Sequence, residues 1–115
     1  AGLFALWAAY ESDVFSGIVC CSGSLWFPDW DHYVRDHMIQ SKCSVYLSLG
    51  GKEEKTKNKV MAAVGDRTRA QEGLLQEDLM VESVVLEWNA GGHFADAGKR
   101  LAKGVKWMFG VKSGL

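Results

Sequence analysis

The stretch Phe15-Ser16-Gly17-Ile18-Val19-Cys20-Cys21-Ser22 is short, nearly continuous in apolar residues at its centre and bounded by small ones. This composition is typical of a β-strand that is buried on both faces. Two further strand-like runs follow it, over residues 43–49, where Gly50-Gly51 ends the run, and over residues 82–88. The sequence therefore predicts three strands in the interior of the protein.

Segments with helical patterns separate these strands. An apolar run covers residues 3–10, a polar one covers 31–40, and apolar residues recur at three- and four-residue steps from 58 to 79. A closing helix is predicted over residues 96–109, with four side chains facing inward: Leu101, Val105, Met108 and Phe109. Strands that alternate with helices form a parallel sheet with helices on its faces. We therefore predict an α/β protein with three layers, α/β/α, around a mainly parallel sheet.

The composition fits one globular domain of 115 residues, of which 48% are apolar. A net charge of −1 gives no reason to expect a nucleic acid or an anionic membrane as a partner. No apolar run reaches the roughly eighteen residues that a membrane span needs. The cysteines, Cys20, Cys21 and Cys43, are odd in number, which is unlike a disulfide framework and fits a reducing compartment. We therefore expect a cytoplasmic protein.

The first ten residues form an apolar helical run with no capping residue before it. A helix normally begins after a Ser, Thr, Asp or Asn that binds its first free N–H groups. A helix that is apolar on nearly every side also belongs inside a larger core. We therefore expect residues 1–115 to be a single partial domain, the later half of a longer fold.

Candidate catalytic residues follow the predicted strands. In an open parallel sheet, active groups gather beyond the carboxyl ends of the strands, which here are the loops 23–30, 50–57 and 89–94. The second loop carries Glu53 and Glu54, and the third carries His93. An acid followed by a histidine in this chain order matches the second half of the Ser…Asp/Glu…His arrangement of α/β-hydrolases.

Four segments of the chain resemble the bacterial esterases that are similar to enterochelin esterase. They are residues 1–8 (AGLFALWA), 22–26 (SGSLW), 47–58 (LSLGGKEEKTKN) and 87–94 (EWNAGGHF). Their order and spacing are fairly specific, and the resemblance extends from Ala1 to about Val111, which is nearly the whole chain.

This resemblance implies the C-terminal half of an α/β-hydrolase fold and the hydrolysis of a small carboxylic ester through an acyl-enzyme, without a cofactor. In this family the nucleophile lies in a Gly-x-Ser-x-Gly/Ala elbow, and Ala1 aligns with the last small residue of that elbow. The serine is thus expected two positions upstream of Ala1, so the printed sequence is expected to be truncated just after the elbow. No Gly-x-Ser-x-Gly occurs within the printed sequence. His93 is the expected general base and acid, and Glu53 the carboxylate that orients it.

The catalytic assignments have plainer alternatives. His93, after a glycine pair, also fits a polar loop residue, and Glu53 and Glu54 also fit solvated charges before a helix. Many members of the family have an Asp at the position of Gly51. Its replacement here favours Glu53 as the acid, with Glu54 as the second candidate.

An aromatic group, Trp26, Phe27 and Trp30, lies in the first of the three loops. These side chains are candidates to bind an acyl or aromatic part of the substrate, and they also fit a cap on the core. The neighbouring His32 and Asp36 are four residues apart, which is a possible metal-ligand spacing, but a helix this polar is usually a solvated surface. We therefore predict no metal site.

Two other classes of protein remain as alternatives. One is a non-catalytic α/β module that binds a partner chain or a small ligand, and the other is a flavodoxin-like binding domain, which the Gly91-Gly92-His93 loop disfavours. In the resembled fold the strand at residues 15–22 pairs with a strand that precedes the serine. We therefore expect this chain to self-associate or to pair with the missing N-terminal half through that edge.

Overall fold

The computed structural model describes the chain except residues 1, 22, 24, 56, 90–96 and 113–115. The described chain alternates helices and strands. In order the elements are α1 (Gly2–Glu11), β1 (Gly17–Cys21), α2 (Trp30–Asp36), β2 (Cys43–Gly50), the 3₁₀ turn η1 (Glu53–Lys55), α3 (Lys59–Ala62), α4 (Val64–Glu77), β3 (Val81–Asn89) and α5 (Ala97–Lys112).

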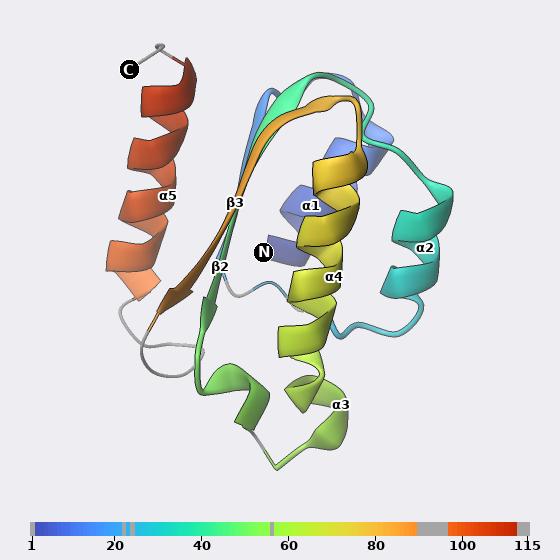
Figure 1. Ribbon diagram of the computed structural model, residues 1–115, viewed down its shortest axis with the longest axis vertical. Helices are drawn as coiled ribbons and strands as arrows, with labels where there is room; N and C mark the ends of the chain where they lie inside the picture. Colours follow the sequence, from blue (N-terminus) through green and yellow to red (C-terminus); the bar gives the residue numbers. More distant parts are fainter. Residues whose placement is uncertain (1, 22, 24, 56, 90–96, 113–115) are drawn as a thin grey trace.

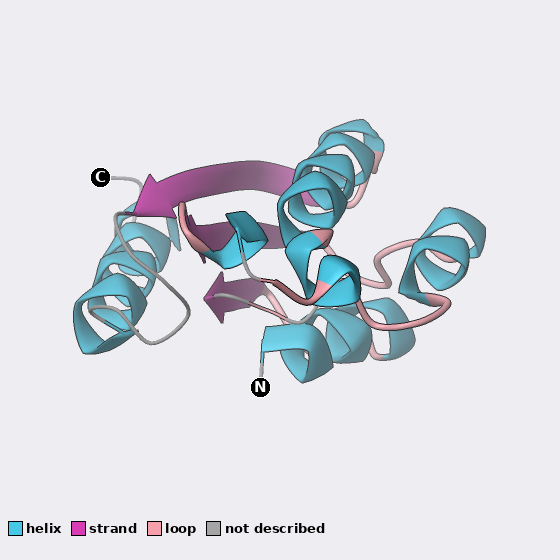
Figure 2. Cartoon of the chain, turned by 90° about the horizontal axis from the view of Figure 1, so that it is seen from below, coloured by secondary structure: helices cyan, strands magenta, loops and turns pink. Residues whose placement is uncertain are grey.

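The three strands form a parallel sheet in the order β1-β2-β3 (Figures 1 and 2). Strand β2 lies in the middle, and each of its eight residues is buried. Its apolar residues alternate with Ser44, Tyr46 and Ser48, and both sets are buried because helices cover both faces of the sheet. The predicted α/β architecture with a parallel sheet is confirmed.

Helices cover both faces of the sheet, with α5 on one side and α1, α2 and α4 on the other (Figure 1). The face toward α1 and α4 is apolar, because residues of β1 and β2 pack there against both helices in one buried cluster. This cluster contains Leu6, Ile18, Cys20, Val45, Leu47 and Leu75. Burial of these side chains stabilises the described fold.

Helix α5 contacts the sheet through Gly104 and through Trp107, whose ring centroid lies 5.8 Å from that of Tyr46. A Cβ atom at Gly104 would lie 2.5 Å from Val19 Cγ1 and 2.9 Å from Tyr46 Cδ1, so only glycine allows this approach. The prediction for this helix was therefore wrong in part, because Leu101 and Phe109 are 51% and 72% exposed and Val105 is also exposed. Met108, the other residue predicted to face inward, does pack against the sheet, because a Cβ atom at Gly17 of β1 would lie 2.6 Å from its Sδ atom.

The segment predicted as one helix over residues 58–79 is two helices and an extended end. Helix α4 stops because Asp78 has an extended backbone, and its carboxylate accepts hydrogen bonds from the N–H groups of Met80 and Ile39. Leu79, which was counted in the helical pattern, is 89% exposed. In the same way, α2 ends at Asp36 and does not extend to residue 40, because His37 has an extended backbone.

The close contact at Gly104 predicts that alanine at this position destabilises the protein, although alanine usually stabilises a helix relative to glycine. Gly104→Ala should lower the free energy of unfolding by about 1–2 kcal/mol, because the added methyl overlaps Val19 and Tyr46 by more than the better helix propensity of alanine restores. Gly73→Ala in α4 is the matched control. Its Cβ meets nothing within 4 Å, so stability should rise by about 0.5–1 kcal/mol. Urea unfolding followed by circular dichroism measures both, and a stabilising Gly104→Ala would contradict the packing described.

We propose that the outer edge of β1 and the exposed apolar residues of α5 mediate association between copies of the chain. Among the described strands β1 pairs only with β2, and Leu101 and Val105 are exposed on the helix above it. We expect light scattering at micromolar concentration to detect species larger than a monomer. The double change Leu101→Lys and Val105→Lys should reduce them, whereas Leu79→Lys should not. A stable monomer of the unchanged chain would contradict this expectation.

Candidate active site

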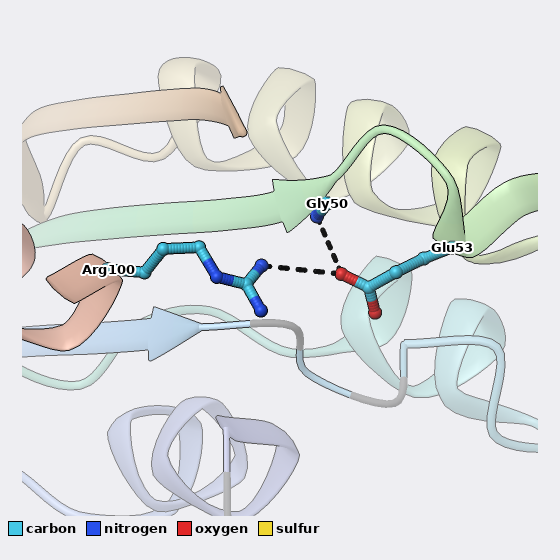
Figure 3. A network of polar contacts seen from close by, with 3 residues as sticks. All are labelled: Gly50, Glu53 and Arg100. Atoms are coloured by element: carbon cyan, nitrogen blue, oxygen red, sulfur yellow. Dashed lines mark hydrogen bonds and ion pairs between the residues drawn. The ribbon is translucent and has the colours of Figure 1, made fainter. Parts of the chain in front are cut away.

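The carboxyl end of β2 carries a buried acid. Glu53 follows the strand after a short turn, and its side chain is 5% exposed. Its Oε2 atom accepts a hydrogen bond of 2.6 Å from the backbone N–H of Gly50 and lies 3.5 Å from Nη1 of Arg100 (Figure 3). The side chain of Arg100 is itself 3% exposed. Glu53 is thus not the solvated charge of the plainer alternative.

The turn that presents Glu53 also holds the end of the next strand. The N–H of Gly51 donates a 2.7 Å hydrogen bond to the carbonyl of Asn89, the last residue of β3. Arg100, which bonds Glu53, lies in the first turns of α5. The turn of residues 50–53 therefore contacts the two elements that flank segment 90–96, one on each side in the sequence.

His93, the predicted base, belongs to segment 90–96 and lies outside the described residues. The same holds for Ser22 and Ser24. The assignment of His93 stays a prediction, as does the role of Glu53 as its acid. The structure establishes that Glu53 is a buried carboxylate, ion-paired with Arg100, at the carboxyl edge of the sheet.

A second polar group lies between β2, β3 and α5. The hydroxyl of buried Tyr46 donates a 2.8 Å hydrogen bond to Glu87 Oε2, and Lys103 Nζ donates one of 2.9 Å to Glu87 Oε1. These two hydrogen bonds, that from Lys103 foremost, lower the pKa of Glu87. Burial and the neighbouring Glu87 raise the pKa of Tyr46. These hydrogen bonds join α5 to the sheet, so Tyr46, Glu87 and Lys103 have a structural role.

The three predicted substrate-binding aromatic residues have different surroundings. Phe27 is 55% exposed, Trp26 is half-buried, and Trp30 is 7% exposed as part of the hydrophobic core. The indole N–H of Trp30 donates a 2.9 Å hydrogen bond to Gln71 Oε1, and Gln71 Nε2 donates one of 2.8 Å to the hydroxyl of Tyr10. Trp30 is thus a core residue, which was the plainer alternative for this group.

A cavity of about 30 Å³ lies between α2 and α4, and Trp30 and Gln71 form part of its wall. This volume holds about one water molecule. The substrate-binding role of Trp26, Phe27 and Trp30 stays a prediction. Trp30 in addition has a structural role, because it is part of the hydrophobic core.

Sequence reasoning missed Arg100 and the Tyr46–Glu87 contact. Arg100 stands between Lys99 and Leu101 in a helix rich in lysine, which is the pattern of a solvated face. The available signal was its residue type, because arginine is favoured over lysine in buried ion pairs.

The part of the chain that the structure describes shows no group of three or more His, Cys, Asp or Glu side chains placed to bind a metal ion. Asp31, in the polar helix considered for metal binding, instead forms a 2.8 Å ion pair with Arg67. None of the described helices has the length and apolar character to span a membrane.

Comparisons with known proteins support the α/β fold of this chain. No protein-family model matches the chain. No curated protein matches it significantly. Among solved structures it is similar to the siderophore hydrolase EstB from Aspergillus nidulans, with a TM-score of 0.70 and 21% sequence identity over 93% of this chain. The chain spans 45% of the length of that protein, and the similarity shows a shared α/β fold.

The hydrogen bonds of Gln71 predict how strongly the aromatic core depends on it. Gln71→Met keeps the size of the side chain but removes the partner of the Trp30 N–H and of the Tyr10 hydroxyl, so stability should fall by about 2–4 kcal/mol. Gln76→Met on the exposed face of the same helix should change stability by less than about 0.5 kcal/mol. Denaturant unfolding followed by tryptophan fluorescence measures both, and equal effects would show that the Gln71 contacts contribute nothing specific.

Proposed function

We propose that this chain carries the acid and histidine of a serine ester hydrolase, which cleaves a small carboxylic ester through an acyl-enzyme. The observation that carries this proposal is the buried carboxylate of Glu53 at the carboxyl end of the central strand. In open parallel sheets this edge is where ligands bind and where catalytic groups gather. The similarity to a solved hydrolase of the same fold supports the proposal.

In the proposed mechanism His93 removes the proton from the attacking serine hydroxyl and later donates it to the leaving alcohol. Glu53 accepts a hydrogen bond from the imidazole, holds it in the useful tautomer and stabilises its charged form. Two described contacts support this pairing. Gly51 bonds Asn89, the residue before segment 90–96, and Glu53 bonds Arg100, which follows that segment by four residues, so described residues on both sides of the segment contact the turn with Glu53.

The nucleophile is proposed to come from polypeptide outside the printed sequence, because this sequence contains no Gly-x-Ser-x-Gly elbow. The solved hydrolase of the same fold is more than twice as long as the stretch that this chain covers, which leaves room for such an elbow. The alternative is a non-catalytic α/β module that binds a partner chain.

Turnover of p-nitrophenyl acetate and butyrate tests the proposal. The 115-residue chain should show no turnover above buffer, whereas a polypeptide extended upstream through a Gly-x-Ser-x elbow should be active. In that polypeptide His93→Ala and Glu53→Gln should each lower kcat by about 10⁴-fold, because each is a member of the triad.

Glu54→Gln is the control, since it removes the adjacent carboxylate, and it should leave most of the activity. Equal and small losses from Glu53→Gln and Glu54→Gln would mean that the acid comes from elsewhere. Turnover by the short chain that survives His93→Ala would overturn the assignment of His93. An inactive longer polypeptide would favour the binding module.

A further inference from the structure

Four exposed lysines follow the central strand at the carboxyl edge of the sheet. Lys52 and Lys55 belong to the turn that holds Glu53, Lys57 precedes α3, and Lys59 is the first residue of α3. Helix α3 lies at the end of the sheet toward which the strands point (Figure 1). The four lysines therefore place positive charge at the edge where the ester is proposed to bind.

These four side chains have no counter-charge of their own in the part of the chain that the structure describes. The ion pairs described there involve other cations, namely Arg67, Arg69, Arg100 and Lys103, and no hydrogen bond of the four lysine ammonium groups is found. Three of those four cations are at least partly exposed, so exposure alone does not explain the difference.

The acids in the same segment offset little of this charge. Glu53 is buried and already paired with Arg100, so Glu54 is the remaining carboxylate between residues 51 and 59. The protein as a whole has a net charge of −1. The positive excess after β2 is therefore local, and the overall composition conceals it.

A local excess of charge acts on a substrate without direct contact. The Debye length is about 8 Å at physiological ionic strength, so charges in the turn of Glu53 reach a molecule bound beside that turn. Surface charge of one sign raises the local concentration and the association rate of a substrate of the opposite sign. A run of lysines is also common on a merely solvated surface, and that alternative predicts no such effect.

We propose that the ester cleaved at this site is anionic, and that Lys52, Lys55, Lys57 and Lys59 select it through its negative charge. This inference rests on the proposed function and deepens it by naming the class of substrate. The lysines contribute to binding and take no part in the chemical step. Their effect therefore falls on kcat/KM through KM, and kcat stays nearly constant.

The test compares three p-nitrophenyl esters of similar size in the polypeptide that extends upstream through the serine elbow. They are the glutaric acid monoester, which is anionic, the hexanoic acid ester, which is neutral, and the ester of γ-trimethylammoniobutyric acid, which is cationic. At about 20 mM salt, replacement of all four lysines by glutamine should lower kcat/KM about tenfold for the anionic ester and raise it for the cationic one. The neutral ester should change by less than about twofold.

A common loss for all three esters would show that the lysines support only the structure of the site, and would overturn the proposal. The charge of the substrate can lie in its acyl part or in its alcohol part. Butyrate esters of phenol and of p-hydroxybenzoic acid therefore provide a second comparison, with the charge in the alcohol part. The proposal is overturned if the lysine substitutions lower kcat/KM selectively for neither anionic ester.

Salt tests the same interaction without any substitution. At about 0.5 M salt the Debye length falls to a few ångströms, so the attraction of the lysines is screened. In the unchanged polypeptide, kcat/KM for the anionic ester should then fall about fivefold from its value at about 20 mM, whereas the neutral ester should change by less than about twofold. A flat response of the anionic ester would overturn the proposal even if a substituted variant did not fold.

Lys42 is the matched control, because it is exposed and directly precedes β2, at the opposite end of the same strand. Lys52→Gln and Lys42→Gln change the net charge by the same amount. Lys52→Gln should lower kcat/KM for the anionic ester about twofold, and Lys42→Gln should leave it unchanged. Equal effects would mean that only the net charge of the protein matters, which contradicts selection by the lysines at the site.

Failure of this inference and failure of the proposed function give different results. If the longer polypeptide hydrolyses the neutral ester and shows no dependence on substrate charge, ester hydrolysis stands and only the class of substrate is wrong. If it hydrolyses none of the esters, the proposed function fails and the selection of an anionic ester falls with it.

Discussion

The complete burial of β2 is the constraint on which the rest of the structure depends. Each of its eight residues is inaccessible to water, so its backbone N–H and C=O groups must all find partners inside the protein. Strands β1 and β3 supply those partners on the two sides, and helices must then cover both faces. Glu53 follows the carboxyl end of this strand by three residues, in the turn that continues from it.

The two faces of the sheet are held by different physical means. Toward α1 and α4, apolar side chains such as Leu47 and Leu75 form the main core, and their burial is the dominant favourable term. Toward α5, the contact includes a close backbone approach at Gly104, the packing of Met108 against Gly17, and polar contacts from Arg100 and Lys103. Hydrogen bonds and ion pairs are directional, so the contacts of Arg100 and Lys103 help to fix the orientation of α5 against the sheet.

The fold was largely predictable from the sequence, because a buried strand such as β2 is recognisable as a short, largely apolar run. The same reasoning misplaced the inner face of α5, since it ranked Leu101 and Phe109 above Gly104, and a glycine gives no apolar signal. At the candidate site the position of Glu53 after a strand was predictable, but its burial was not. Burial of a carboxylate requires a partner from another element, and Arg100, 47 residues away, cannot be paired with it from spacing alone.

A buried ion pair resists replacement in a way that an apolar contact does not. Removing one partner leaves an uncompensated charge away from water, which costs about 3–5 kcal/mol, although the intact pair adds little net stability. The arrangement of Glu53 and Arg100 therefore has few alternatives close in energy, and the carboxylate is held in one orientation. Orientation is the property that a triad acid must supply, because it acts by fixing the tautomer and direction of an imidazole. Under the proposed function, a fixed orientation of the Glu53 carboxylate is therefore what the buried ion pair at the carboxyl edge of the sheet would supply.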